Sequence, residues 1–297
     1  MLYVDAQGNE FEQPAELVIL SAFSLNNVKL MLNSGIGRPY DPATGQGTVG
    51  RNYTHQTQAA ATVFYAEDIN INPYMGAGAL GTMLDDFNGD NFDHAGLGFV
   101  GGAYIAAWTH SGRPIEYHPA PPGTPRWGLG WKQAVRRHYN HTVVLEAEGN
   151  SLPTATNYLS TDPTYRDAYG QPLLRITFDF PENDLRMSRY VVDRAVEIGR
   201  LMGGEVVSRG YRFGPYSIVP YQTTHPSGGA VMGADPTTSA VNRYLQSWDV
   251  PNVFVQGASA FPQKAGKDVT GTVGALAYWS AKAIREQYLK QPGPLVQ

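Results

Sequence analysis

Cysteine is missing from this chain of 297 residues. Without cysteine, these residues can form no disulfide bond, thiolate nucleophile, cysteine-based zinc finger or iron–sulfur ligation. Any redox chemistry carried out here would therefore depend on an organic cofactor.

Long apolar runs and an excess of positive charge are missing as well. No stretch approaches the roughly 18 consecutive apolar residues of a membrane span. The first residues, Met1 to Gly8, lack the basic start and the apolar core of a signal peptide. The formal net charge is -4, and the one basic cluster, Lys132, Arg136 and Arg137, is short. These features predict no nucleic-acid partner and leave the localisation of the chain unknown.

The residues that are present suit a globular, turn-rich fold. A hydrophobic content of 42% over this length is enough to bury a sizeable core in one large domain or two smaller ones. The 33 glycines and 21 prolines are scattered and form no low-complexity run, so they mark turns and not disorder.

The opening segment suits one layer of a sheet with a helix beside it. Residues 2–4 are predicted to form a strand, 5–9 a turn, and 17–20 a second, buried strand. A short helix is expected from Leu25 to Asn33, and it ends at the glycines of 34–37.

The middle of the chain, from about 59 to 216, favours an antiparallel sheet with long connections. Alternating or apolar strand patterns lie at 62–65, 99–108, 142–145 and 174–178. A helix is predicted to begin at 181–184 and to end at Gly203 and Gly204. Its apolar stripe, read as core packing, consists of Val191, Val192, Ala195, Ile198 and Leu201.

The closing segment has a different character. A strand at 253–255 runs through Gly257 into a turn, and a helix is expected from Thr270, its predicted N-cap, to about Leu289. A strand, a glycine turn and a helix N-terminus that meet at one place form a typical cofactor cradle. We therefore expect the opening strand and this closing segment to share one layered sheet.

Several motif matches have simpler explanations. The spacing G-x-G-x-x-G begins at Gly45, Gly76 and Gly96, but turn-like residues precede each match where a dinucleotide fingerprint needs an apolar strand. Residues 85–93 alternate oxygen ligands like a calcium loop but lack its glycine and its terminal glutamate. A solvated turn is favoured there.

A metal pair and a hydrolase are also disfavoured. His138 and His141 are three residues apart, but no third ligand is evident, so surface histidines are favoured and no metal site is predicted. The hydrolase motif G-x-S-x-G is absent, because Phe261 follows the run 257–260 where the second glycine belongs. A hydrolase that uses His225, Asp268 and a serine therefore has no elbow to support it.

His225 stands out because of its surroundings. It lies in the segment 221–229, where a proline and two glycines fix a tight backbone that holds the imidazole at the edge of a cavity. Oxidation of an alcohol requires a base that takes the hydroxyl proton while hydride leaves the carbon, and histidine titrates in the right range. A purely structural histidine is the alternative, and the sequence around it decides between the two.

Three blocks of sequence resemble the glucose-methanol-choline (GMC) flavoprotein oxidoreductases, and specifically the branch of gluconate, sorbitol, fructose and FAD-dependent glucose dehydrogenase large subunits. The blocks are Val18–Gly37 with Val49–Asn52, His225–Gly229 with Met232–Pro236, and Asn252–Pro262 with Thr270–Ala277. Their order and spacing are specific. The resemblance extends over essentially all 297 residues and is weakest at about 60–130.

The resemblance implies FAD as the cofactor and a role for each matching residue. His225 takes the position of the catalytic base of the family. The loop after the closing strand matches the one at the ribityl and pyrophosphate region of the flavin, and the last helix points its positive end at the pyrimidine side of the ring. The implied cofactor-binding residues are Ala22, Asn52, Gly257, Ala258, Ser259, Phe261, Thr270, Gly271 and Thr272.

Three departures from the family pattern affect these expectations. Phe23, Asn27 and Val28 replace the usual glycine, serine or threonine, and proline, although the dehydrogenase branch is similar to this chain there. Asp268, the second predicted catalytic residue, replaces an asparagine that orients the substrate hydroxyl, and a carboxylate cannot donate unless it is protonated. The unit that anchors the adenosine would lie roughly 200 or more residues upstream of Met1, so little FAD is expected to bind to this chain alone.

Together these observations predict a mixed α+β and α/β fold. Residues 1–58 are expected to form part of an FAD-binding layered sheet, 59–216 an antiparallel-sheet substrate domain with helices on one face, and 217–297 the return to the FAD-binding domain. The expected activity is oxidation of a CH–OH group of a sugar, polyol or sugar acid. The alternative is a non-catalytic, truncated remnant that binds a ligand or a partner subunit through the old substrate surface.

The same branch implies partners and a location. A haem-containing electron-acceptor subunit and a small accessory subunit are expected beside the sugar or polyol substrate. Members of the branch are typically periplasmic and associate with the membrane through these partners.

Overall fold

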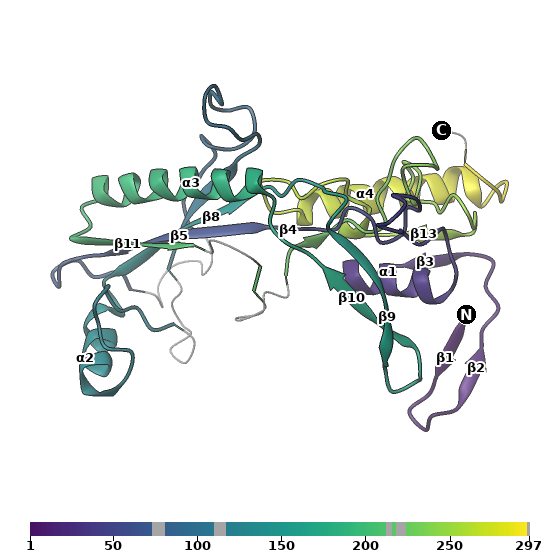
Figure 1. The fold of residues 1–297 in the computed structure, drawn as a ribbon, viewed down its shortest axis with the longest axis horizontal. Coiled ribbons are helices and arrows are strands. Elements are labelled where there is room, and N and C mark those ends of the chain that lie inside the picture. The colour runs from purple at the N-terminus through teal and green to yellow at the C-terminus, as the bar shows by residue number, and fades with distance from the viewer. Residues whose placement is uncertain (73–80, 110–116, 212–215, 218–223, 296–297) are drawn as a thin grey trace.

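The structure is a computed structural model that describes residues 1–72, 81–109, 117–211, 216–217 and 224–295. The molecule is elongated and has two lobes (Figure 1). One lobe holds a five-stranded sheet with a long helix, and the other holds both ends of the chain. The predicted mixed α/β class is therefore confirmed, while the exact domain boundaries stay a prediction.

The five-stranded sheet is antiparallel throughout, in the order β11-β5-β8-β7-β6. Its strands are β5 (Thr57–Phe64), β6 (Met83–Leu84), β7 (Ala103–Trp108), β8 (Thr142–Gly149) and β11 (Val206–Tyr211). The predicted strand at 99–108 begins only at Ala103, because Gly101 has φ 86 and bends the backbone out of the strand conformation.

Helix α3 (Glu182–Leu201) packs across one face of this sheet (Figure 1). The buried contacts join Met187, Val191, Val192 and Ala195 of the helix to apolar residues of β5, β7 and β8. The predicted stripe is wrong at its end, because Leu201 is 88% exposed. Leu201 follows Val192 by about two and a half helical turns, so it points to the opposite side of the helix.

The carboxyl group of Asp184 lies in the first turn of α3 and is fully buried. Burial raises its pKa to about 6 from 3.8. The folded chain therefore keeps a proton that the unfolded chain loses between about pH 4 and 6, and stability declines as pH rises through this window. We expect Asp184→Asn to stabilise the chain at pH 7 by up to about 2 kcal/mol and to change little at pH 4. Urea unfolding at both pH values tests this, and equal effects at the two would contradict it.

Helix α1 (Ser24–Asn33) covers a small parallel sheet that joins the two ends of the chain. Strand β3 (Val18–Leu20) pairs in parallel with β13 (Val253–Val255), so the opening and closing segments share one sheet, as the sequence predicted. Val28 and Met31 of the helix pack with Val253 and Val255 in a second core. The prediction that the whole of 17–20 is buried is wrong, because strand alternation turns Ile19 away from this core and leaves it 50% exposed.

Asn27 of α1 connects the opening and closing segments. Its side chain is fully buried, accepts a hydrogen bond from the Ala22 N–H (2.8 Å), and donates to the Gln256 carbonyl (2.7 Å) and the Ser259 hydroxyl (3.1 Å). We expect Asn27→Ala to lower the free energy of unfolding by about 2–4 kcal/mol, because it leaves several buried polar groups unpaired. Chemical denaturation checks this, with the exposed Asn26→Ala as the neutral control. Equal losses in the two variants would contradict it.

The last helix, α4 (Thr270–Ala283), continues into a π-helical turn (Ile284–Tyr288) that packs on Phe254. The prediction that Thr270 is the N-cap is wrong. Val269 already has helical φ and ψ, and its carbonyl accepts the first helical hydrogen bond from the Val273 N–H (2.8 Å). The rest of α4 is apolar but poorly covered, since only Ser280 and Ala283 are buried.

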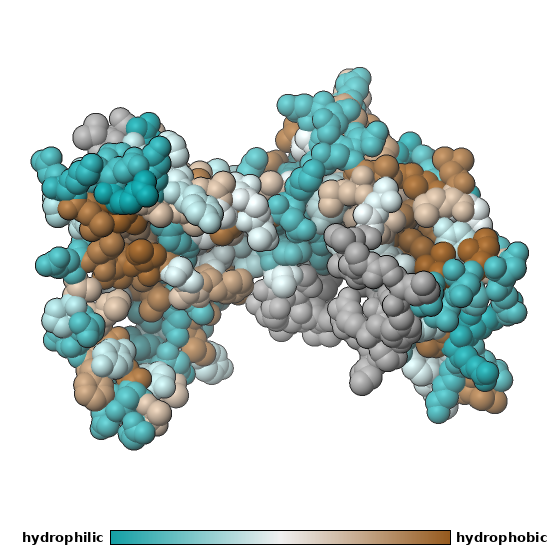
Figure 2. All heavy atoms as spheres, turned by 180° about the vertical axis from the view of Figure 1, so that it is seen from behind, coloured by the Kyte–Doolittle hydropathy of each residue, from teal (hydrophilic) through white to brown (hydrophobic). Residues whose placement is uncertain are grey.

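Hydrophobic surface is exposed on the lobe that carries α1, β3 and α4, on the left of Figure 2. The large exposed apolar side chains of these elements are Ile19, Leu30, Tyr278 and Trp279. Among the described residues, no helix is both long and apolar enough to span a bilayer.

The remaining elements are peripheral or very short. Two hairpins project from the second lobe, and helix α2 lies on the side of the sheet away from α3 (Figure 1). These elements are β1 (Leu2–Val4) with β2 (Glu10–Glu12), β9 (Tyr158–Arg166) with β10 (Pro172–Thr177), and α2 (Gly128–His138). The short pair β4 (Thr54–His55) and β12 (Pro226–Ser227) connects the sheet to the loop of His225.

Candidate active site

The loop of His225 is held between the first and third predicted blocks. His225 has φ 66, a conformation that non-glycine residues rarely adopt. Just after it, the Gly228 N–H donates to the Ala258 carbonyl (2.9 Å), and the space beside Gly228 is filled by the Asn52 carbonyl. Parts of the three blocks of the resemblance therefore meet at one place.

The imidazole of His225 lies between two carboxylates. Asp268 Oδ1 is 3.7 Å from His225 Nε2, and Glu148 Oε1 is 3.9 Å from Nδ1. The side chain of His225 is 27% exposed, and its Nδ1 has no hydrogen-bond partner among the described residues. The structure thus brings both predicted catalytic residues together and adds Glu148, which sequence reasoning missed.

Glu148 belongs to a polar row across the sheet. Gln58 on β5 and Tyr104 on β7 are its direct neighbours in register. Gln58 Nε2 donates to Glu148 Oε1 (3.3 Å), and the Tyr104 hydroxyl donates a short hydrogen bond to Oε2. Burial and the bond to Glu148 raise the pKa of Tyr104 far above its usual range, so the hydroxyl stays a neutral donor. It also lies 3.4 Å from Asp268 Oδ2 and connects the two acids.

Lys264 is a second residue that the sequence did not reveal. It lies between the two stretches of the third block, and two backbone hydrogen bonds with Ser151 attach its loop to the end of β8. Its side chain is fully buried, and its Nζ donates to the Lys267 carbonyl (3.3 Å). Burial lowers the pKa of Lys264 to about 8, although the charges of Asp268 and Glu148 oppose this shift. A buried ammonium group therefore lies within electrostatic reach of both acids, without a direct ion pair to either.

This cluster also has the spacing of a metal site. Ligand atoms of Glu148, His225 and Asp268 lie within 4.8 Å of one another, and no other such group occurs among the described residues. The Tyr104 hydroxyl is already bonded to Glu148 Oε2, and the charge of the Lys264 ammonium, which acts on both acids, disfavours a second cation. We assign no metal here, and the absence of a metal site stays a prediction.

The predicted cofactor loop is only partly accessible. Gly257 and Ala258 are partly exposed at the start of a short 3-10 turn, η1 (Ala258–Ala260), and Gly257 has φ 101 with open space beside it. Ser259 and Phe261 are buried, and the Ser259 hydroxyl is bonded to Asn27. The first two residues therefore present a surface to a ligand, whereas the Ser259 and Phe261 side chains support it from within.

The other predicted cofactor residues lie at exposed backbone. Thr270, Gly271 and Thr272 are exposed in the first turn of α4, which has no side-chain cap and no acidic residue. Ala22 is exposed, and Asn52 adopts φ 59 beside Gly228. Uncapped N–H groups at a helix start suit a group that gains negative charge, so these positions fit one side of a reduced flavin. Binding of FAD by each residue stays a prediction.

Among the described residues, the motifs that the sequence disfavoured contribute no side chain to the group of Glu148, His225 and Asp268, although residues 85–93 lie against the loop that carries Asp268. Residues 85–93 form turns, and Asp85 pairs with Lys267 (3.1 Å). His138 ends α2, and His141 Nδ1 lies 2.6 Å from the Ile69 carbonyl. The glycine match at Gly76 lies outside the described residues.

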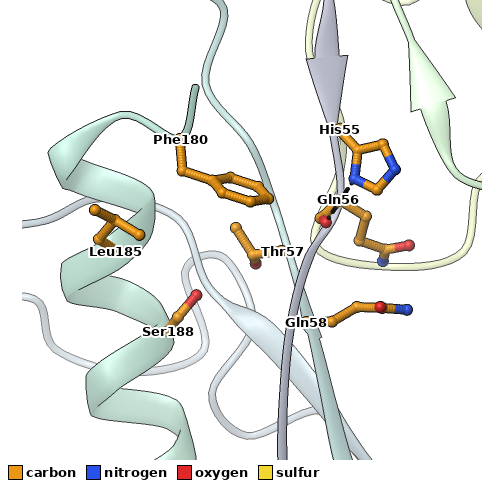
Figure 3. A pocket seen from close by; sticks show the side chains of 7 residues that line it. All are labelled: His55, Gln56, Thr57, Gln58, Phe180, Leu185 and Ser188. Atoms are coloured by element: carbon orange, nitrogen blue, oxygen red, sulfur yellow. Dashed lines mark hydrogen bonds between the residues drawn. The ribbon is translucent and has the colours of Figure 1, made fainter. Parts of the chain in front are cut away.

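A small pocket lies under the start of α3 (Figure 3). Thr57, Phe180, Leu185 and Ser188 converge on it, whereas Gln56 and Gln58 point to the other side of β5. Its volume is about 10 Å³, which is enough for a single water at most. This pocket is a gap in the core and not a substrate site.

Comparison with known proteins finds a family match and curated relatives. The family model described as GMC oxidoreductase matches residues 153–277. The chain is 54% identical over 298 residues to the gluconate 2-dehydrogenase flavoprotein of Pantoea cypripedii, covering 99% of this chain and 48% of the relative. It is 25% identical to the fructose dehydrogenase large subunit of Gluconobacter japonicus, covering 91% and 47%. The chain therefore spans about half the length of these curated relatives.

Solved structures show the same fold at low sequence identity. Pyridoxine 4-oxidase from Mesorbium loti superposes with a TM-score of 0.63 at 17% identity, covering 96% of this chain and 54% of that one. Formate oxidase of Aspergillus oryzae RIB40, studied for its FAD modification, gives 0.63 at 16% identity, covering 97% and 57%. FAD, predicted from the resemblance, is the cofactor of this family. Residues 153–277 thus carry the C-terminal domain of the GMC flavoprotein oxidoreductases, which confirms the resemblance seen in the sequence.

Proposed function

We propose that this chain supplies the substrate-facing, proton-accepting part of a FAD-dependent dehydrogenase that oxidises a CH–OH group of a sugar acid, sugar or polyol. The observation that carries the proposal is the position of His225, in a strained loop beside the start of α4 and between Glu148 and Asp268. Strained, half-buried histidines with charged neighbours are typical of catalytic sites.

In this proposal His225 Nε2 accepts the proton of the substrate hydroxyl. FAD, when bound, supplies the acceptor for the hydride that leaves the same carbon. Glu148, 3.9 Å from Nδ1, stabilises the imidazolium that results. The Tyr104 hydroxyl, bonded to Glu148 and 3.4 Å from Asp268, keeps both acids in place.

The cofactor would be held on this chain by exposed backbone near the same loop. Gly257 and Ala258 would line the ribityl and pyrophosphate side, and the first turn of α4 would face the pyrimidine side of the ring. Ala22 and Asn52 would complete this surface. The N–H groups of α4 favour the negative charge of the reduced flavin.

The relatives motivate the substrate class and the partners. The relative at 54% identity carries a gluconate 2-dehydrogenase name, so a sugar acid is the first substrate to test. The word subunit in the fructose dehydrogenase name supports assembly with other chains. We propose a haem-containing electron acceptor and a small accessory subunit, at the periplasmic side of a membrane.

Asp268 favours one alternative. A carboxylate at this position cannot donate a hydrogen bond to substrate unless it is protonated. A non-catalytic domain that binds a sugar-like ligand or a partner subunit through the same surface would tolerate this exchange.

Dye-coupled oxidation of gluconate, sorbitol, fructose and glucose distinguishes the two functions. The chain is assayed alone and together with the remaining part of the Pantoea cypripedii flavoprotein. We expect turnover of at least one substrate in the combined sample and little in the chain alone. No turnover under either condition, in a combined sample that holds FAD, would contradict the enzyme and favour the binding domain.

A further inference from the structure

We propose that Lys264 is a positioning residue whose buried ammonium group is the counter-charge that allows Glu148 and Asp268 to flank His225. The catalytic consequence of this inference rests on the proposed function. The charge pairing between Lys264 and the two acids is independent of that function. It assigns a role to a buried charged group that no step of the proposed reaction uses directly.

The geometry places the ammonium group between the elements that carry the two acids. Backbone hydrogen bonds between Lys264 and Ser151 (3.0 and 3.2 Å) fix the lysine beside the end of β8. Ser151 is three residues after Glu148 in the sequence. At its other end, Nζ donates to the carbonyl of Lys267, the residue just before Asp268. The Lys264 side chain is fully buried and the Glu148 side chain is only 9% exposed, so solvent screens this pair little. The Asp268 side chain is 50% exposed, so its attraction to the ammonium group is screened and weaker.

A count of the charges around His225 shows why a cation is required. The groups facing the cluster are Glu148 on β8, Tyr104 on β7, and Asp268 and Lys264 on the closing loop. Glu146, two residues before Glu148 on β8, adds a more distant negative charge that acts on Tyr104. Tyr104 is a neutral donor, and Lys267, the other nearby cation, is half-exposed and paired with Asp85. Without Lys264 two carboxylates would face one imidazole, and they would favour its protonated form, which is not a base.

The fold itself does not benefit from a charge at this position. Burial lowers the pKa of Lys264 to about 8, which means that the protein destabilises the ammonium despite the two acids. An apolar side chain of similar length would avoid this cost. Groups that reduce stability and remain in a cluster of titratable residues are characteristic of functional sites.

The same pairing accounts for Asp268. With the ammonium group beside it, a carboxylate can occupy the position before α4 without adding net charge next to the flavin site. Lys264 and Asp268 together then replace the single neutral amide of the family pattern. In this proposal Lys264 offsets the negative charge that Asp268 introduces in place of the asparagine of the family.

The first test measures stability against pH in the purified chain. Between about pH 8 and 10.5 the unfolded chain keeps the lysine proton that the folded chain has lost, so stability rises with pH in this window. We expect the urea midpoint of the wild type to rise above pH 8 and this rise to disappear in Lys264→Met. In Asp268→Asn the rise should begin about half a unit lower, because one attractive charge is lost. Lys267→Met, which removes the exposed lysine, is the matched control and should keep the wild-type profile.

The second test measures the pH profile of kcat/KM in the sample combined with the remaining part of the flavoprotein. We expect Lys264→Met to move the acidic limb upward by about one unit, and Asp268→Asn added to it to move the limb back. A lysine that only fills space would give a lower urea midpoint and an unmoved limb, which overturns the proposal. A stability profile unchanged in both Lys264→Met and Asp268→Asn overturns the charge pairing. Absence of oxidation in every form, with the stability shifts present, contradicts the proposed function instead and leaves the charge pairing supported.

Discussion

Replacing His225 by alanine is expected to lower kcat/KM for dye-coupled oxidation by about 10²- to 10⁴-fold, the usual contribution of a general base. In the proposed reaction the imidazole Nε2 is the atom that accepts the hydroxyl proton, and alanine has no group to replace it. KM should change much less than kcat, since the variant retains the polar row of Gln58, Tyr104 and Glu148. Steady-state kinetics in the combined sample measures both values.

A matched histidine shows whether this loss is specific. His141→Ala removes an imidazole at the other end of β8, where its ring contacts the Ile69 carbonyl and no acid of the cluster. We expect this variant to keep wild-type kinetics. If His225→Ala retained more than about a tenth of the wild-type kcat/KM, the base would have to be another group.

Gly228→Ala is expected to destabilise the chain by about 3 kcal/mol or more and to displace the loop of His225. Gly228 has φ 80, and an added Cβ would lie 2.1 Å from the Asn52 carbonyl oxygen. Backbone cannot move away as a flexible side chain would, so the bond from the Gly228 N–H to Ala258 must break or lengthen. Urea unfolding measures the loss of stability, and the pH profile of oxidation reports on the displaced imidazole.

Gly257→Ala distinguishes the cost of the backbone conformation from the cost of steric overlap. Gly257 also has a positive φ, 101, but nothing lies within 4 Å of an added Cβ. We expect a loss of about 1–2 kcal/mol from the backbone conformation alone. Similar losses in Gly228→Ala and Gly257→Ala would show that the close approach to Asn52 does not determine the loop.

Local patterns in the sequence were enough for much of the framework. The helical spacing around Val191 and Ala195 predicted α3, and the apolar runs at 17–20 and 253–255 predicted two strands of one sheet. The prolines and glycines after His225 predicted its tight loop. Each of these features depends on residues that are neighbours in sequence, so the local sequence pattern was sufficient to predict it.

The completed site depends on contacts between distant residues. Glu148 meets Tyr104 and Gln58 because of the register of β7, β8 and β5, and no short-range signal sets that register. The alternating acids Glu146 and Glu148 on β8 were the available hint, since two acids on one face of a strand need a reason. Lys264 follows no periodic pattern, and its burial results from bonds to Ser151 more than 100 residues earlier.

The departures from the family pattern acquire physical roles in the structure. Asn27, which replaces a serine or threonine, holds Ala22, Gln256 and Ser259 together with three hydrogen bonds. Asp268 follows Lys267, whose carbonyl accepts a hydrogen bond from the buried ammonium of Lys264. Substitutions that looked unfavourable one at a time are therefore consistent with their three-dimensional surroundings.

The most direct test of the account is anaerobic reduction of the flavin in the combined sample. Substrate is added to the FAD-loaded sample without any acceptor, and the visible flavin absorbance is followed. We predict that gluconate, sorbitol, fructose or glucose bleaches the flavin within one turnover, and that the bleaching is lost in His225→Ala. Bound FAD that stays oxidised with all four substrates, or that is bleached equally in His225→Ala, would contradict the assignment of this chain as the proton-accepting part of a dehydrogenase.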